Sequence, residues 1–373
     1  MMEERLINFI KDYISQSTKK AITYEEYMNI ALYHERYGYY MKSQQKIGSK
    51  GDFITSSNIS NMFGMIFARV FLDASSQQHL PLIICEIGAG NGRFAKAILD
   101  EFQNRFPEVY EDVVYLIIES SPYHRKLQQE VLPIGEKVIQ FDSLEQAKLA
   151  YPSFQGIIIS NELFDAFPVR VIEKQDGHIF EVKVTVDENG MLTEMLTKLD
   201  DKEVLRYLDT QKITLSNQQR FEVPLSMIEY IKQLGDFVDK GLIYTIDYGY
   251  TNEEWMLPEH KKGSLRGYYQ HKMIDNPLQH PGDMDLTTHI SFDALIYYGQ
   301  QVELAFVQKM RQDEFLLSAG ILDYLQEHYD PNPFSEVSKQ NRAIRSLIMG
   351  GGISQSFQVV IQSVGLNKHK KKR

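Results

Sequence analysis

The chain has 373 residues, 43% of them apolar, which is enough for one large α/β domain with insertions or for two smaller domains. Its formal net charge of −10 argues against a nucleic-acid-binding body, because binding phosphates requires a clustered basic surface. We therefore expect no nucleic-acid partner. The single cysteine excludes a disulfide framework and cysteine-rich zinc sites, which fits a reducing compartment, so we expect a cytoplasmic protein.

The first 80 residues have helical patterning. Apolar residues recur at helical spacing from Leu6 to Ile14, with acidic residues among them. Transit peptides are poor in acidic residues and signal peptides have a continuous apolar region, so this segment resembles neither. Further helical stretches cover residues 24–33 and 59–71. We therefore predict an N-terminal helical cap over residues 1–80. No apolar stretch in the sequence approaches the roughly 20 residues of a membrane span, so we expect no membrane partner.

From residue 81 the pattern changes to short apolar runs that alternate with helix-length segments. This rhythm predicts an α/β fold with a mostly parallel sheet and helices on both faces. The predicted strands are 82–87, 113–118, 138–141 and 156–159, and the predicted helices are 94–106 and 123–131. We place the core of the fold in residues 81–168 and 241–365, with closing strands at 306–317 and 355–362.

The rhythm breaks after Pro168. Two turn signals, Asp176-Gly177 and Asn189-Gly190, separate β-rich runs, and a helical stretch covers about 226–238. We predict that residues 169–240 form an inserted hairpin and helix. Residues 248–292 have little periodicity and are expected to form an active-site loop, because long loops in compact domains are usually functional. Residues 366–373 read as a solvated basic tail.

A glycine-rich turn follows the first predicted strand of the core. Glu86 precedes Gly88, Gly90 and Gly92, after which helix-forming residues begin. Glycines at a strand-to-helix turn let the backbone approach a ligand and point the amides of the helix N-terminus at it. A dinucleotide fingerprint would need a third glycine where this chain has Arg93, so the spacing disfavours a pyrophosphate ligand.

The spacing resembles the first motif of the S-adenosylmethionine-dependent methyltransferases, in which the acid before the first glycine faces the amino-acid end of the cofactor. Glu119 ends the next predicted strand, where a carboxylate accepts hydrogen bonds from both ribose hydroxyls. Asp142 follows the third strand, where related enzymes place an acid near the adenine. An ordinary turn or a helix cap is the alternative role for Asp142.

Several ordered blocks resemble a narrower family, which includes the mitochondrial complex I assembly-factor arginine methyltransferase and its bacterial relatives. The blocks run in order from about residue 24 to residue 292, and the closing third of the chain matches weakly. They are Tyr27-Met28, 37–40, 51–56, 59–60, 63–64, 161–169, Asp247-Tyr248-Gly249, 265–268, 281–282, 285–287 and His289. The resemblance implies a Rossmann-like class I methyltransferase fold, S-adenosylmethionine as cofactor and a protein arginine as acceptor.

The block at residues 51–56 supplies further cofactor candidates. Gly51 would start a loop over the cofactor, Phe53 would stack on it, and Thr55 or Ser56 would donate hydrogen bonds to its carboxylate end. A structural lid held by turn and helix caps is the alternative.

The acceptor candidates follow the fourth strand of the predicted core. Methyl transfer from a sulfonium is an in-line displacement, and carboxylates can grip and orient a guanidinium acceptor. Glu162 and Asp165 lie where ligands of open α/β sheets bind, and Asn161 would hydrogen-bond the acceptor amine. The alternative is that Asn161 caps a short helix whose first turn contains Glu162 and Asp165.

The late loop contributes Arg266, Tyr268, Asp285 and His289 as candidates for the acceptor pocket. For His289, a structural hydrogen-bonding role is the alternative. The remaining histidines lack metal-ligand spacing, so no metal is predicted.

Three functions stay open at the level of sequence: a protein methyltransferase with arginine favoured, a small-molecule methyltransferase, and an assembly protein that binds the cofactor without turnover. The sequence does not predict an oligomeric state.

Overall fold

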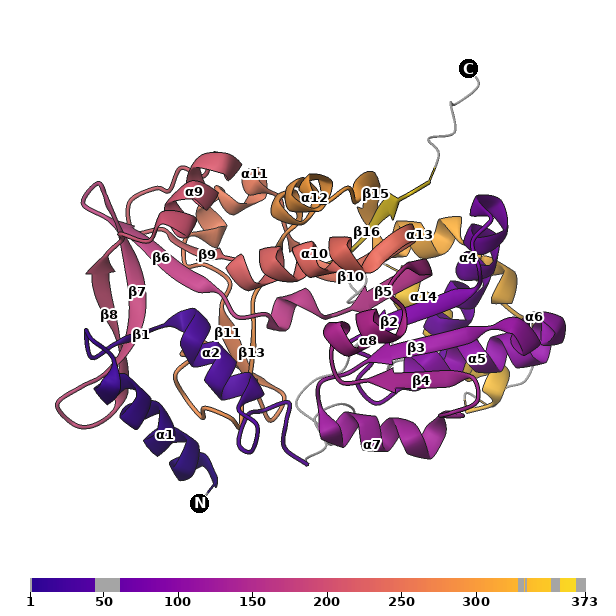
Figure 1. Ribbon diagram of the computed structural model, residues 1–373, viewed down its shortest axis with the longest axis horizontal. Coiled ribbons are helices and arrows are strands. Elements are labelled where there is room, and N and C mark those ends of the chain that lie inside the picture. Colours follow the sequence, from indigo (N-terminus) through magenta and orange to yellow (C-terminus); the bar gives the residue numbers. More distant parts are fainter. Residues whose placement is uncertain (1, 44–60, 328–331, 333, 350–355, 367–373) are drawn as a thin grey trace. The chain divides into compact units, whose positions relative to one another are not determined.

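The computed structural model describes residues 2–43, 61–327, 332, 334–349 and 356–366 (Figure 1). The described residues divide into two compact units. The first unit lies within residues 1–53, 164–232 and 249–298, and the second unit lies within residues 54–163, 233–248 and 299–373. Among the described helices, none is both long and apolar enough to cross a membrane.

A mostly parallel β-sheet forms the centre of the second unit. Its strands lie in the order β15-β16-β10-β5-β2-β3-β4. The pairs from β4 to β10 are parallel, and β16 and β15 add antiparallel pairs at one side. The strand bounds are β2 Ile83–Ile87, β3 Val114–Ile118, β4 Val138–Phe141, β5 Phe154–Asn161, β10 Val238–Tyr250, β15 Ala305–Arg311 and β16 Phe357–Val364.

Helices cover both faces of this sheet, as the alternating pattern predicted. Their bounds are α4 Asn61–Gln78, α5 Arg93–Arg105, α6 Pro107–Asp112, α7 Pro122–Val131, α8 Leu144–Ala150, α13 Gln312–Ser318, η3 Ile321–Tyr324 and α14 Glu336–Ile348. Helix α4 presents Phe63, Phe67 and Phe71 on one stripe, and all three are fully buried. The Phe67 ring lies 5.7 Å from that of Phe94 and 5.3 Å from that of Phe315. Burying each such ring contributes about 1.5–3 kcal/mol.

The strand order reverses between β2 and β5. From β2 the chain proceeds outward to β3 and β4, then returns to β5 and proceeds to β10 on the other side. Ligands of open α/β sheets bind outside the carboxyl ends of the strands at such a switch point. Glu86, on β2, and Asn161, which ends β5, lie at the two strands that flank this point.

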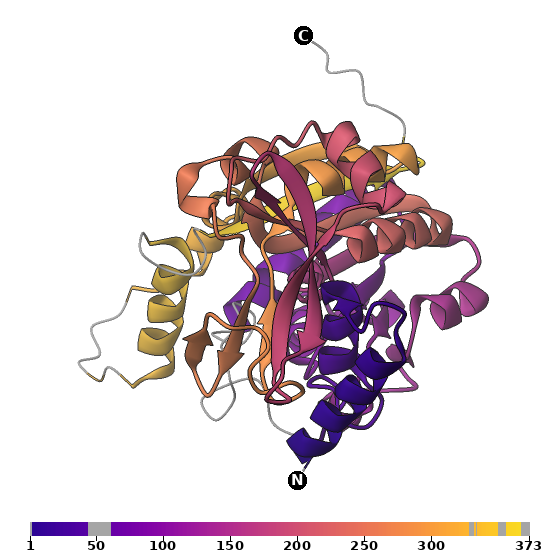
Figure 2. The ribbon, with the colours of Figure 1, turned by 90° about the vertical axis from the view of Figure 1, so that its left-hand side faces the viewer.

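The first unit contains an antiparallel sheet with the order β1-β7-β6-β9, and β8 pairs with β7 (Figure 2). A three-stranded sheet, β12-β11-β13, and the short parallel pair of β14 with the end of β10 complete its described strands. The strands are β1 Ile22–Thr23, β6 Arg170–Gln175, β7 His178–Val186, β8 Leu192–Lys198, β9 Arg220–Val223, β11 Arg266–Tyr269, β12 Lys272–Ile274, β13 Asp285–Thr287 and β14 Ile290–Ser291. The helices are α1 Met2–Gln16, α2 Tyr24–Tyr33, η1 Phe164–Ala166, α9 Lys202–Gln211, α11 Asn252–Trp255 and η2 Pro258–His260, and α10 Leu225–Phe237 and α12 Phe292–Gln301 begin in this unit.

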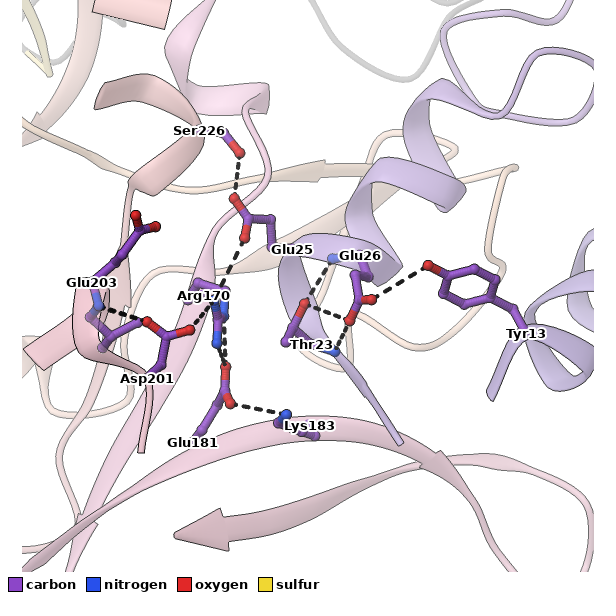
Figure 3. Close-up of polar contacts among 11 residues, drawn as sticks. Tyr13, Thr23, Glu25, Glu26, Arg170, Glu181, Lys183, Asp201, Glu203 and Ser226 are labelled. Atoms are coloured by element: carbon purple, nitrogen blue, oxygen red, sulfur yellow. Dashed lines mark hydrogen bonds and ion pairs between the residues drawn. The ribbon is translucent and has the colours of Figure 1, made fainter. Parts of the chain in front are cut away.

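A buried cation joins several elements of the first unit (Figure 3). Arg170 on β6 donates to Glu181 on β7 at 2.6 Å and lies 3.1 Å from Asp201, the N-cap of α9. Glu25 on α2 lies 3.9 Å from Arg170 and accepts a hydrogen bond from Ser226 on α10. Because these carboxylates come from different chain segments, Arg170 ties helix α2 and the start of α9 to the inserted sheet.

The predicted hairpin turn at Asp176-Gly177 is confirmed. Gln175 pairs with His178 across β6 and β7, and both turn residues have positive φ, 48° for Asp176 and 82° for Gly177. Two such residues match the right-handed twist of the flanking strands, which is why an Asp-Gly pair suits this position.

Three segments differ from the sequence expectation. Residues 248–292, expected as one loop, contain the short elements α11, η2, β11, β12, β13 and β14. The single closing strand expected at 306–317 is instead β15 followed by α13. The helices grouped as one cap lie in different units, α1 and α2 in the first and α4 in the second. Periodicity did not reveal this division, because it reports which face of a helix is buried but not which core buries it.

Candidate cofactor and acceptor sites

The predicted glycine turn connects β2 to α5 in the second unit. Gly88, Gly90 and Gly92 all have left-handed φ, at 73°, 53° and 79°. A Cβ on Gly88 would lie 2.9 Å from Leu163 Cδ1, and one on Gly92 would lie 3.0 Å from Gln128 Cγ. Both the backbone conformation and the close packing therefore require glycine. Gly92 is the N-cap of α5 and supplies no side-chain cap, and the first amide of the helix, that of Arg93, donates to Asn91 Oδ1 at 3.2 Å.

Glu119 closes the turn from the neighbouring strand. Its Oε2 accepts a hydrogen bond from the Gly90 amide at 2.9 Å, and its Oε1 accepts one from the Ser121 amide at 2.8 Å. A carboxylate has about four acceptor sites, so each oxygen retains one after these two bonds. Glu119 keeps 7% of its surface exposed. Its remaining acceptor capacity fits the two hydroxyls of a ribose.

Two glutamines that the sequence did not single out support the same turn. The Gln128 side-chain amide on α7 donates to the Gly90 carbonyl at 2.7 Å, and Gln140 on β4 donates to Gln128 Oε1 at 2.7 Å. Gln128 is fully buried. No local pattern marks a mid-helix glutamine as a partner of a turn 38 residues away, so only the tertiary structure identifies it.

Glu86 lies on β2, with 4% of its surface exposed. The Tyr115 hydroxyl donates to Glu86 Oε2 at 2.8 Å. Burial raises the pKa of Glu86 to about 8; the hydrogen bond from Tyr115 opposes this rise, and the nearby Glu119 carboxylate adds to it. A bound cation at this carboxylate would favour its ionised form.

Asp142 is exposed and follows β4 directly. Its backbone amide donates to Gln146 Oε1 at 3.2 Å, and the next residue, Ser143, is the N-cap of α8. The helix cap is therefore Ser143 rather than Asp142. The role of Asp142 near an adenine stays a prediction.

At the carboxyl end of β5, Asn161 and Glu162 have an unusual geometry. Asn161 Nδ2 donates to Glu162 Oε1 at 3.1 Å, and Asn161 Oδ1 is buried with no hydrogen-bond partner among the described residues. Glu162 has a φ of 53°, a left-handed conformation that costs a side-chain-bearing residue about 1–3 kcal/mol and that clusters at functional sites. The Glu162 amide donates to the Ile246 carbonyl at 2.9 Å, which holds this conformation in place.

The helix-cap alternative for these residues is wrong. The short helix η1 begins at Phe164, so Asn161 ends a strand and Glu162 precedes the helix instead of lying in its first turn. Asp165 alone lies within the helix. The left-handed φ of Glu162 turns the chain between strand and helix, a change of direction that residue types alone did not predict.

The first unit brings two acceptor candidates near one tyrosine. Tyr40 donates to Asp285 Oδ1 at 2.7 Å, and Thr288 donates its amide to the Asp165 carbonyl at 2.8 Å. Asp165 is 5% exposed and Asp285 is 2% exposed. Burial, followed by the carboxylate of Asp285 and more weakly that of Asp165, raises the pKa of Tyr40 well above its usual value. Tyr40 therefore faces a pair of buried carboxylates from η1 and β13.

The other candidates of the late loop gather around Ser264. Arg266 donates from Nε to the Ser264 carbonyl at 2.9 Å, and the His289 amide donates to Ser264 Oγ at 2.9 Å. The His289 ring stacks on Tyr250 with centroids 4.6 Å apart. Burial lowers the pKa of His289 to about 3, with Arg266 and His260 acting in the same direction, so the ring is neutral near pH 7. Tyr268 on β11 pairs with Asp285 on β13.

The cofactor candidates Gly51, Phe53, Thr55 and Ser56 lie outside the described residues. Within the described ranges, no group of three or more histidine, cysteine, aspartate or glutamate residues is arranged to hold a metal ion. Cys85 is buried, and burial raises the pKa of its thiol.

Comparisons with known proteins relate this geometry to a chemistry. A family model described as S-adenosyl-L-methionine-dependent methyltransferase matches residues 62–309. The chain is 25% identical over 350 residues to the protein arginine methyltransferase NDUFAF7 homolog of Caenorhabditis elegans, covering 84% of this chain and 77% of that protein. It is 25% identical over 346 residues to protein arginine methyltransferase NDUFAF7 of Danio rerio, covering 80% of this chain and 76% of that protein.

A crystal structure of a Burkholderia thailandensis protein bound to S-adenosyl-homocysteine is similar over 98% of this chain and 93% of that chain. The TM-score is 0.88 and the sequence identity is 26%. A native crystal structure from the same organism gives a TM-score of 0.85 over the same shares, also at 26% identity. The likeness extends over nearly the whole chain, and the first of these structures holds the demethylated cofactor.

Proposed function

Because this chain belongs to the S-adenosyl-L-methionine-dependent methyltransferase family, we propose that it transfers the methyl group of this cofactor to an arginine side chain of a protein. The chain has the class I methyltransferase fold, and S-adenosylmethionine is its cofactor. The observation that carries the choice of arginine is that relatives named protein arginine methyltransferases align over about four fifths of the chain.

The proposed cofactor site lies in the second unit. Glu119 would accept the ribose hydroxyls, and the glycine turn, which carries no side chains at Gly88, Gly90 and Gly92, would let the cofactor approach the protein backbone closely. Glu86 would face the cationic amino-acid end, because a buried carboxylate with a raised pKa is stabilised as an anion by a nearby positive charge. The bound cofactor supplies an electrophilic methyl group.

The acceptor chemistry agrees with the acidic residues near the ends of β5 and β13. A guanidinium is always charged, and carboxylates bind its planar N–H groups in pairs. Glu162 would orient the reacting nitrogen, and Asn161 Oδ1, which has no partner among the described residues, would accept a hydrogen bond from it. In the first unit, Asp165, Asp285, Arg266, Tyr268 and His289 stay predictions for binding of the acceptor.

The test uses cells that lack the gene. Their soluble proteins are incubated with the purified chain and S-adenosylmethionine labelled in its methyl group, and the proteins are then hydrolysed to amino acids. We expect the label in methylated arginine, and we expect Glu162→Gln to abolish most of it while the variant still binds S-adenosylhomocysteine. Label in another amino acid would overturn the arginine acceptor, and cofactor binding without any transfer to protein would overturn it as well.

A further inference from the structure

Tyr115 and Glu86 form a buried pair that the family comparisons assign to no role. The two residues lie on neighbouring parallel strands, where Ile84 pairs with Tyr115 and Glu86 pairs with Ile117. Because alternate residues of a strand share one face, Glu86 and Tyr115 lie on the same face of the sheet. The tyrosine therefore reaches about two residues along the strand direction, roughly 6–7 Å, to place its hydroxyl on the carboxylate.

We propose that Tyr115 is a positioning residue for the cofactor: it holds Oε2 of Glu86 so that Oε1 is presented to the α-ammonium group of S-adenosylmethionine. The inference rests on the proposed assignment of Glu86 to the amino-acid end of the cofactor. Its structural basis is the 2.8 Å hydrogen bond between two side chains that are 0% and 4% exposed.

The arrangement of donors around Glu86 favours this role. Among the described residues, Tyr115 is the hydrogen-bond donor to Glu86, and it uses Oε2. A glutamate has rotatable side-chain bonds, and a fixed donor on one oxygen restricts where the other oxygen lies. Because the Glu86 carboxylate is already oriented in the free protein, binding of the ligand costs less conformational entropy of this side chain.

The surrounding charges favour a cationic ligand. Glu119 directly follows the adjacent strand, and its charge acts on Glu86. Cys85 precedes Glu86 in the sequence. His124 lies 3.8 Å from Glu119. The Glu119 carboxylate disfavours the ionised form of Glu86, and an ammonium group bound at Glu86 would offset that repulsion. A ligand group without a hydrogen-bond donor would gain nothing from the orientation of Glu86, and a charged donor gains more than a neutral one.

The test compares two ligands on matched variants. S-adenosylhomocysteine carries the amino-acid end, and 5′-methylthioadenosine keeps the adenosine and sulfur but lacks that end. Tyr115→Phe removes the hydroxyl and keeps the ring. Tyr244→Phe is the control, because Tyr244 is 4% exposed on β10 in the same hydrophobic core. Titration calorimetry gives both affinities, and melting curves establish folding; Glu86→Gln, which keeps the size of the side chain and changes the other partner of the same contact, is used if Tyr115→Phe does not fold.

We expect Tyr115→Phe to weaken S-adenosylhomocysteine about tenfold, because a misplaced Glu86 Oε1 forfeits most of its hydrogen bond to the charged ammonium group, and to change methylthioadenosine by less than about twofold. Tyr244→Phe should change neither affinity. Equal losses for both ligands, or no loss for S-adenosylhomocysteine, would overturn the role of Tyr115. Glu86→Gln distinguishes the assignment of Glu86 from the role of Tyr115. If Glu86→Gln leaves the affinity for S-adenosylhomocysteine unchanged, the assignment of Glu86 fails. If Glu86→Gln lowers this affinity and Tyr115→Phe does not, only the positioning role of Tyr115 is refuted.

Discussion

Individual carboxylates of the second unit have different partners and therefore different chemistry. Glu119 binds two backbone amides and stays suited to accept hydroxyls, whereas Glu86 has a tyrosine partner and a raised pKa. The difference arises from the donors around each residue, because both are buried at the ends of adjacent strands.

We predict that Glu119→Ala weakens S-adenosylhomocysteine binding by about 1.5–3 kcal/mol, because hydrogen bonds to a charged group are lost. The amides of Gly90 and Ser121 lose the same partner, so the melting temperature should fall modestly while the protein stays folded. Calorimetry and melting curves check both effects, with Glu145→Ala, at an exposed position of helix α8, as the control. Unchanged affinity in Glu119→Ala would remove this residue from the cofactor site.

The pKa of Glu86 predicts a pH dependence of cofactor binding. In the free protein Glu86 holds its proton up to about pH 8, and the cofactor's ammonium favours the carboxylate. Binding must therefore release the proton below that pH, so affinity should rise with pH, by up to about tenfold per unit, and level off above the pKa. Glu86→Gln should make this part of the profile flat. A wild-type profile that falls between pH 6 and about pH 8 would contradict the assignment.

The Glu86 carboxyl also makes the stability of the protein depend on pH, and here the effect of rising pH is unfavourable. The pKa of Glu86 is about 8 in the folded protein, against an ordinary value of 4.5 in the unfolded chain. Between these values the folded state binds the extra proton, so the contribution of Glu86 to the free energy of unfolding falls as pH rises through this window.

At the scale of elements, the end of β5 combines a strand, a left-handed residue and a short helix. Glu162 is held at φ 53° by its amide bond to Ile246, at a position where glycine would be unstrained. A charged residue kept in a conformation that suits glycine is a reason to look for a role of its side chain.

We predict that Glu162→Gly leaves the stability unchanged or raises it by about 1 kcal/mol, because the backbone strain is relieved, and that it abolishes most methyl transfer. Lys212→Gly is the matched control, since Lys212 is exposed and has φ 56° at the C-cap of α9. This control should gain similar stability and keep full transfer. Normal transfer by a stable Glu162→Gly variant would exclude Glu162 from the acceptor site.

At the scale of the whole molecule, each compact unit is assembled from three separated stretches of the chain. In the first unit, Arg170 connects α2, β7 and the start of α9, so this buried cation is central to that assembly. Breaking a buried ion pair leaves a charge without its partner, which costs far more than breaking a surface pair.

We predict that Arg170→Ala lowers the free energy of unfolding by about 3 kcal/mol, the low end of the range for a broken buried pair, because Glu181 is 3% exposed and keeps only its ion pair with Lys183 at 3.2 Å. Lys19→Ala, which removes an exposed pair with Asp200, should cost less than about 1 kcal/mol. Denaturant titrations of the two variants measure the difference. A similar small loss in both would mean that the Arg170 network does not hold the segments together.

The sequence by itself determined the parallel core, the glycine turn and the Asp-Gly hairpin, because strand runs, left-handed glycines and turn pairs are properties of neighbouring residues. Resemblance added the methyltransferase fold and its cofactor, and both are confirmed. Only the tertiary structure showed that α4 belongs to a different unit from α1 and α2, and that Glu162 precedes η1 in a left-handed conformation. It also showed that Tyr115 binds Glu86, 29 residues away in the sequence. These features depend on which strands become neighbours and which core buries each helix, and that long-range pairing is not encoded in any local spacing.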